Sequence, residues 1–232
     1  MSKEIETLSK QDGHCIVNTD AFLDEEVIQI GAGRSGSTVV WQILNHIYSK
    51  AWKTHKISPD LFAKKDVKIF FTYRDPRDIT LSRLRTLKDL NILSQKDINI
   101  NSIAQANQGH DLQSYLCSYL KSNYKDILLI KYEDFFTTEN SDCKKVINTI
   151  VKFAGISLSE SELDTINSKV SKSNNAKIQQ NFNSFHEGDH ESGIHGKHIA
   201  DSKQLHWRDL LNEDQLNYLN KMCEADIKYF NY

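Results

Sequence analysis

The chain has 232 residues, of which 39% are hydrophobic and 26% are charged, and its formal net charge is −2 at pH 7. This composition is typical of a globular domain with its own core, and so small a net charge excludes a global attraction to nucleic acid or to an anionic membrane. We therefore expect one domain with neither of these partners, in which any anion site comes from a local group of basic residues.

The N-terminal and cysteine patterns indicate a cytoplasmic protein. Residues 1–25 read as a polar lead-in without the apolar core of a secretion signal, and no apolar run reaches the length of a membrane span. The four cysteines are widely scattered, with no pair at metal-ligand spacing. Scattered cysteines without a signal are typical of reduced thiols, so we expect neither a disulfide framework nor a metal site.

Predicted strands and helices alternate along the chain. In chain order the sequence predicts a strand at 27–30, a helix over 36–49, a short strand at 51–57, a strand at 67–73, a helix over 76–88, a helix over 112–124, a strand at 127–130, a helix around 143–151 and a final helix capped by Asn212. This order favours an α/β domain over residues 26–232, with a central parallel sheet and helices on both faces. Residues 171–206 are polar and predict a lid or binding loop, with a disordered excursion as the alternative.

Residues 31–38, which read GAGRSGST, follow the first predicted strand and open the first predicted helix. Small residues let backbone N–H groups approach an anion, and the start of a helix adds partial positive charge. A nucleotide triphosphatase loop has a lysine where Ser37 stands, and the cation here is Arg34 instead. The pattern therefore predicts a P-loop-like cradle for a phosphate-like group, but not one built for ordinary ATP chemistry.

Three further polar motifs lie towards the carboxyl ends of predicted strands. They are KTH at 53–55, YRDPRD at 73–78 with Ser82 one helical turn further on, and YED at 132–134. Because ligands collect at the carboxyl ends of parallel strands, we expect these motifs to share a pocket with the loop at 31–38. We expect Arg77 and Asp78 to form an ion pair on the helix surface.

With these four motifs the chain resembles a sulfotransferase that uses 3′-phosphoadenosine 5′-phosphosulfate (PAPS). The first loop of that family typically reads PKSGTTW, and this chain reads GRSGST at 33–38 with Trp41 slightly later. The family's KTH, its RNPRD followed by a serine, and its YED are matched at 53–55, at 74–78 with Ser82, and at 132–134. The C-terminal family motif RKGxxGDW is not kept, although Trp207 is present.

The resemblance implies PAPS as co-substrate, 3′-phosphoadenosine 5′-phosphate (PAP) as product, and no metal. The residues that it assigns to the 5′-phosphosulfate are Arg34, Ser35, Gly36, Ser37 and Thr38. It assigns Arg74 and Ser82 to the 3′-phosphate and places Tyr132 near the adenine. Because the C-terminal motif is altered, Lys197, His198 and Lys203 are the candidates to close over the 3′-phosphate.

Three residues are the candidates for catalysis. His55 is the expected general base, because imidazole titrates near neutrality and can accept the proton of a hydroxyl group. Lys53 would stabilise charge on the transferring sulfuryl group, and Arg34 would grip two oxygens although a guanidinium donates protons poorly. Glu133 or Asp134 is the alternative base, since some branches of the family use a carboxylate.

The expected acceptor is a hydroxyl of a small molecule such as a secondary metabolite, because the chain is short for the family. Acidic residues at 187, 189 and 191 in the predicted lid have two interpretations: a solvated loop, or recognition of a cationic acceptor such as a guanidinium or amine alkaloid. The alternative functions are transfer to a carbohydrate, a P-loop kinase or NTPase-like phosphotransferase, and a binding module that has lost catalysis.

Overall fold

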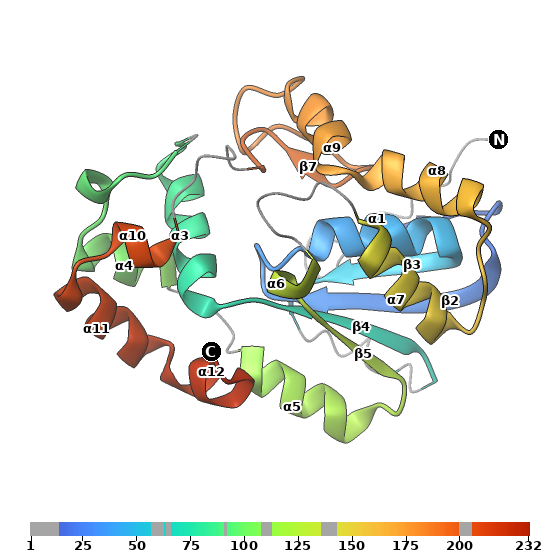
Figure 1. The fold of residues 1–232 in the computed structure, drawn as a ribbon, viewed down its shortest axis with the longest axis horizontal. Coiled ribbons are helices and arrows are strands. Elements are labelled where there is room, and N and C mark those ends of the chain that lie inside the picture. The colour runs from blue at the N-terminus through green and yellow to red at the C-terminus, as the bar shows by residue number, and fades with distance from the viewer. Residues whose placement is uncertain are drawn as a thin grey trace.

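The computed structural model describes residues 14–56, 63, 66–90, 92–107, 113–135, 143–199 and 206–232. A five-stranded sheet lies at its centre, with the strand order β1-β3-β2-β4-β5 (Figure 1). The strands are β1 (His14–Val17), β2 (Leu23–Gly31), β3 (Tyr48–Thr54), β4 (Lys68–Tyr73) and β5 (Ile127–Lys131). β2 to β5 pair in parallel and β1 pairs antiparallel with β3, which confirms an α/β fold with a mostly parallel sheet.

Helices cover both faces of this sheet (Figure 1). The α-helices are α1 (Ser37–Ile47), α3 (Pro76–Leu87), α4 (Ile100–Asn107), α5 (Gln113–Asn123), α6 (Tyr132–Phe135), α7 (Lys144–Ala154), α8 (Glu160–Val170), α9 (Lys172–Gln179), α10 (Trp207–Leu210), α11 (Glu213–Met222) and α12 (Glu224–Phe230). Neighbouring strand residues pack on opposite faces: Val27 joins the core cluster under α1, α7 and α8, while Ile28 joins the cluster under α5.

A third apolar cluster lies beside the sheet, between α3, α4, α10 and α11. The side chain of Asn212 accepts a hydrogen bond from the backbone N–H of Gln215 and caps α11, as the sequence predicts. The single predicted final helix is two helices in the structure, because α11 ends at Met222 and α12 begins at Glu224, with Cys223 between them. Among the described residues, no helix is long and apolar enough to cross a membrane.

The N-terminal region differs from the expected polar lead-in at residues 14–17, which form the edge strand β1. Cys15 and Ile16 are buried and belong to the clusters on opposite faces of the sheet. A four-residue strand carries too little alternation to stand out among polar neighbours, so the sequence pattern misses it. Residues 1–13 lie outside the described part of the chain.

The segment expected as a lid contains more regular structure than the sequence predicts. It includes α9 and a small hairpin of β6 (Gly188–Asp189) and β7 (Ile194–His195), while residues 200–205 lie outside the described part. The segment is attached to α1 by a buried pair of amides, in which Gln42 and Asn175 donate to each other at 3.1 and 3.0 Å. Polar attachment of this kind leaves no apolar periodicity in the sequence.

Candidate active site

The loop between β2 and α1 makes the tight turn that its small residues predict. The backbone φ is 74° at Arg34 and 84° at Gly36, both in the left-handed region. The Ser35 hydroxyl donates to the carbonyl of Ala32 at 2.6 Å and lies 2.7 Å from Oγ1 of Thr72, which ties the loop to β4. In the described chain no side chain caps the start of α1, so its first turn is suited to an anion.

Arg34 connects this loop to α3 and to the lid segment. Its Nε donates to Oγ of Ser82 at 3.0 Å, and its Nη2 donates to the carbonyl of His198 at 2.6 Å. Burial lowers the pKa of Arg34 to about 9, with further lowering by the guanidinium groups of Arg85 and Arg74. The structure therefore brings Arg34 and Ser82 together, as expected. It also places the positively charged guanidinium groups of Arg74 and Arg85 near Arg34.

Lys53 lies near the end of β3 and reaches the first turn of α1. Its Nζ donates to Oγ1 of Thr38 at 2.7 Å and lies 5.5 Å from the ring centre of Trp41. Burial, and secondarily the charge of Arg34, lowers the pKa of Lys53 to about 8. A Cβ added at Gly193 would be 3.5 Å from Nζ of Lys53, so this part of the lid lies close to the Lys53 ammonium group.

His55 follows β3 on the same side as Lys53, two residues later. Its Nδ1 lies 2.7 Å from the carbonyl oxygen of Gly31. A carbonyl only accepts, so this bond selects the tautomer with the proton on Nδ1 and makes Nε2 the basic nitrogen. A Cβ at Gly31 would collide with the backbone of Thr72, so only glycine allows the loop to take this path beside β4.

Arg74 is held at the end of β4 by three neighbours. Its guanidinium lies 4.0 Å from the ring centre of Tyr132, its Nη1 donates to the carbonyl of Arg34 at 3.3 Å, and its backbone exchanges two hydrogen bonds with the amide of Gln113. Tyr132 thus supports the Arg74 cation, a contact that sequence reasoning missed. The buried Nε of Arg74 has no hydrogen-bond partner among the described residues.

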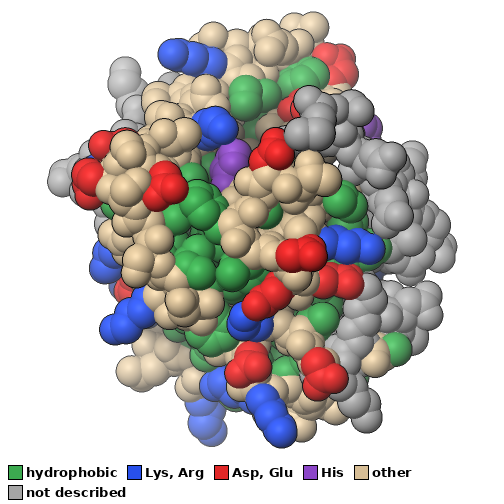
Figure 2. Space-filling view, turned by 90° about the vertical axis from the view of Figure 1, so that its right-hand side faces the viewer, with side chains coloured by type: hydrophobic (Ala, Val, Ile, Leu, Met, Phe, Trp, Pro, Cys, Tyr) green, Lys and Arg blue, Asp and Glu red, His purple; other side chains and the backbone are tan. Residues whose placement is uncertain are grey.

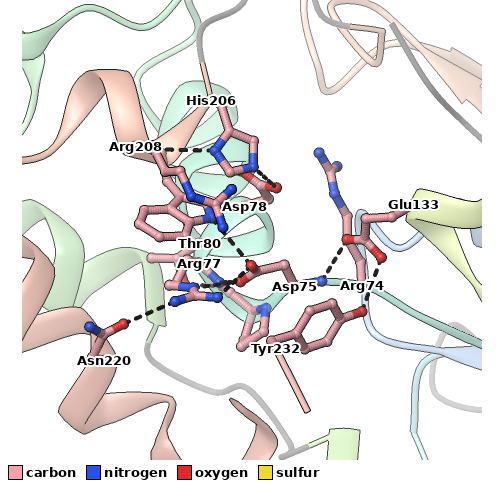
Figure 3. Close-up of polar contacts among 12 residues, drawn as sticks. Arg74, Asp75, Arg77, Asp78, Thr80, Glu133, His206, Arg208, Asn220 and Tyr232 are labelled. Atoms are coloured by element: carbon pink, nitrogen blue, oxygen red, sulfur yellow. Dashed lines mark hydrogen bonds and ion pairs between the residues drawn. The ribbon is translucent and has the colours of Figure 1, made fainter. Parts of the chain in front are cut away.

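The segment after Arg74 is structural (Figure 3). Asp75 caps α3 and holds the guanidinium of Arg77 at 2.8 and 2.7 Å, while Nε1 of Trp207 donates to the same carboxylate at 3.2 Å. The expected pair of Arg77 with Asp78 is therefore wrong, because neighbouring helical residues do not face each other and the N-cap carboxylate is within reach. Asp78 instead lies 3.2 Å from Nε2 of His206.

Glu133 also has a structural role. One of its oxygens accepts from the backbone N–H of Asp75 at 2.9 Å, and the other accepts from the hydroxyl of Tyr232 at 3.1 Å. With both oxygens engaged, the carboxylate is less suited to act as a base than the imidazole of His55.

The lid contributes backbone oxygens to the site. Arg85, which sequence reasoning missed, donates through Nη2 to the carbonyls of Lys197 at 2.8 Å and of His198 at 3.3 Å. The ammonium of Lys197 lies outward, 2.6 Å from Asp89. Burial, and then the charges of Arg34 and Lys53, holds the pKa of His198 well below its usual value. The available signal for Arg85 was its place three residues after Ser82, on the same face of the helix.

These elements form a compact group of cations at the start of α1. Arg34, Lys53, Arg74 and Arg85 come from four segments, and three buried nitrogens of the described chain lack partners: Nε of Arg74, Nε of Arg85 and Nδ1 of His198. Phosphate or sulfate oxygens would satisfy such donors and offset the crowded charge. On the face shown in Figure 2 acidic and basic side chains are interspersed, which fits a local rather than a global basic site.

A metal centre has no comparable set of ligands. No group of three or more His, Cys, Asp or Glu side chains that could hold a metal ion occurs within the described ranges. The rings of His195 and His198 stack at 5.8 Å, next to cations rather than carboxylates.

The structure is similar to solved sulfotransferase structures. It matches mouse sulfotransferase SULT7A1 complexed with PAP, at a TM-score of 0.60 and 15% identity, over 89% of this chain and 87% of the other. It also matches retinol dehydratase in complex with androsterone and inactive cofactor PAP, at a TM-score of 0.59 and 14% identity, over 97% of this chain and 90% of the other. Retinol dehydratase in a complex with retinol and PAP matches at a TM-score of 0.55 and 16% identity, with the same coverage. At such identities these matches establish the fold alone.

The sequence itself identifies the family. No curated protein matches it, but the family model of the sulfotransferase domain matches residues 50–231. That match begins after the loop at 31–38, so the loop adds independent support. Since the match covers well over half of the residues, the chain belongs to the sulfotransferase domain family.

Proposed function

We propose that the protein transfers a sulfuryl group from PAPS to a hydroxyl group of a small molecule and releases PAP. The observation that carries the proposal is the group of four cations around the uncapped start of α1, with buried donors that lack partners. PAP is the nucleotide of the similar solved structures, which supports the choice of nucleotide. The family match supports the reaction.

The proposed nucleotide site has two phosphate subsites. The 5′-phosphosulfate lies at residues 34–38, where the left-handed turn meets the start of α1, which no side chain of the described residues caps. The 3′-phosphate lies at Arg74 and Ser82. Arg34 is hydrogen-bonded to Ser82, so it connects the two subsites. The ammonium group of Lys197 forms an ion pair with Asp89, so we assign the contribution of Lys197 to the site to its backbone carbonyl.

The proposed reaction is an in-line transfer. Nε2 of His55 accepts the acceptor proton while the acceptor oxygen bonds to sulfur, and the bond from sulfur to the 5′-phosphate oxygen breaks with its electron pair left on PAP. The transition state of such a transfer is loose, with charge on the peripheral oxygens, so the protein works by positioning and by charge stabilisation. Lys53, at the helix start beside Thr38, supplies a cation at that point.

The proposed acceptor is a small hydroxylated molecule, such as a secondary metabolite. Androsterone and retinol are bound in two of the similar solved structures, which supports a small acceptor. Two of the three lid acids already hold lid turns: Glu187 accepts from the N–H of Asn183 at 3.0 Å, and Asp189 accepts from that of Ser192 at 2.9 Å. Recognition of a cationic alkaloid would therefore depend on Glu191.

Calorimetric titration with PAP, with AMP and ATP as controls, tests the proposal. We expect PAP to bind far more tightly than AMP, and Arg74→Ala to remove most of that preference, because the guanidinium pairs with the 3′-phosphate. Arg83→Ala, on the adjoining helix α3, is the matched control for loss of one arginine. Binding of ATP with magnesium and no preference for the 3′-phosphate would contradict the proposal and favour a kinase-like protein.

A further inference from the structure

Arg85 belongs to the group of four cations, but neither the expected motifs nor the proposed reaction gives it a role of its own. It lies on α3 and is 1% exposed. No carboxylate of the described chain forms an ion pair with it. Its Nη1 donates to the carbonyl of Leu90 at 3.0 Å, and its Nη2 donates to the carbonyls of Lys197 and His198. Burying a guanidinium without a carboxylate is unfavourable, so the placement calls for a role.

The lid backbone is shaped to meet this guanidinium. Lys197 has a φ of 54°, a left-handed conformation that is unfavourable for a residue with a side chain. The turn directs two successive carbonyls, those of Lys197 and His198, to the same nitrogen of Arg85. The side chain of Lys197 meanwhile reaches Asp89 at the surface, so the lid touches the site through its main chain.

The carbonyl of His198 joins Arg85 to the nucleotide loop. It accepts from Arg85 at 3.3 Å and from Arg34 at 2.6 Å, so one lid oxygen lies between the two guanidinium groups. The altered C-terminal motif leaves Lys197 as the single Lys or Arg in residues 188–199. The arginine at this junction is therefore Arg85 of α3, which donates to carbonyl oxygens of the lid. An arginine on the lid would instead donate from the lid to a phosphate group.

We propose that Arg85 is a positioning residue of the nucleotide site, which holds the Lys197–His198 turn against the phosphate-binding loop and thereby sets how long the nucleotide stays bound. The inference rests on the proposed function, since the nucleotide is the one named there. The other side of the lid is fixed by Gln42, which donates to the carbonyl of Ser192 at 2.7 Å. With both sides fixed, the lid segment closes over Lys53 and Arg34.

The first test compares Arg85→Met with Arg83→Met, a control for the loss of one arginine from the same helix. We expect Arg85→Met to raise the Kd of PAP at least about tenfold, mainly through faster dissociation, because it removes hydrogen bonds from a charged donor. Arg85→Lys keeps the charge but loses the forked geometry, so its dissociation rate should lie between the two. Calorimetry and stopped-flow displacement give these values.

The second test reads the lid without nucleotide. Trypsin cleaves after Lys197, and mass spectrometry reports the rate at that bond. We expect Arg85→Met to accelerate this cleavage several-fold while its circular dichroism and its cleavage elsewhere match those of Arg83→Met. If Arg85→Met does not fold, Arg85→Lys carries the same comparison with a smaller expected change.

The outcomes separate the two proposals. Wild-type protein that fails to bind PAP contradicts the proposed function, while accelerated cleavage after Lys197 still supports the Arg85–lid contact. Wild-type protein that binds PAP, together with an Arg85→Met variant unchanged in PAP dissociation and in cleavage, overturns the role of Arg85.

Discussion

The two walls of the site are built from different interactions. The sheet wall, which comprises residues 31–38, 53–55 and 74, stands on strands whose core residues are completely buried, and its loop is tied to β4 through Ser35 and Thr72. The lid wall, residues 188–199, is joined to it mainly by hydrogen bonds from Gln42, Arg34 and Arg85 to backbone carbonyls. Ligand oxygens can replace the His198 carbonyl on Arg34 without exposing a core, while Arg85 keeps its bond to the carbonyl of Lys197. The sheet wall is thus suited to fixed catalytic geometry, and the lid wall to exchange with a ligand.

The largest expected effect is on the sheet wall at His55. His55→Gln should lower kcat by about 10²–10⁴, because it removes the base while keeping a polar group of similar reach. The Kd of PAP should stay within about threefold, since the role that we propose for His55 concerns the acceptor and not the nucleotide. Steady-state kinetics and calorimetry measure the two quantities. A variant with full kcat would contradict the assignment and favour a carboxylate base.

Lys53 should produce the next largest effect and a pH signature. Lys53→Met should lower kcat/KM for PAPS by about 10²–10³, as expected for loss of one charge-stabilising donor. Because the pKa of Lys53 is lowered to about 8 in the free protein, its charged form is lost as the pH rises through that value. The profile of kcat/KM should therefore fall above about pH 8. In Lys53→Arg the cation persists to higher pH, so the decrease in kcat/KM should move to higher pH. An unchanged pH profile would show that the decrease comes from the titration of another group.

Gly31→Ala tests the rigidity of the sheet wall through stability. The added Cβ would collide with the backbone of Thr72, so we expect a loss of about 1–3 kcal/mol in the free energy of unfolding, measured with urea. Gly33→Ala is the matched control, because a Cβ there has no atom within 4 Å. If both variants lose the same free energy of unfolding, the close approach between Gly31 and Thr72 does not contribute to stability.

The smallest effect is expected at the outer side of the lid wall. Asp89→Asn removes the ion pair with Lys197, but the carboxylate is 53% exposed, so the free energy of unfolding should change by less than about 1 kcal/mol. The Kd of PAP should stay within about twofold. A loss similar to that expected for Arg85→Met would show that the side chain of Lys197, rather than its carbonyl, fixes the lid.

The sheet wall could be predicted from the sequence for a simple geometric reason. Arg34 and Arg74 follow strands and Lys53 lies near the end of β3, and parallel strands bring their carboxyl ends to one edge. The alternation of strands with helices gave the fold class for the same reason. The family motifs then assigned roles, which stay predictions until they are tested.

The lid wall could not be predicted in this way. Its contacts to Arg85 use the carbonyls of Lys197 and His198, and every residue has a carbonyl, so no side-chain pattern marks them. The pairing of Arg77 with Asp75 was missed because it depends on which carboxylate caps the helix. The strand at 14–17 was missed because its partner, β3, is far along the chain and its own pattern is short.

The left-handed backbone of Arg34 sets activity against thermal resistance at one position. A side chain at φ 74° strains the chain, and the pKa lowered to about 9 means that the folded state disfavours the charge of this guanidinium. Glycine at this position would relieve both costs but would remove the guanidinium that we propose binds the donor nucleotide. Under the proposed function, selection for heat resistance alone would therefore eliminate Arg34, whereas selection for turnover would retain it.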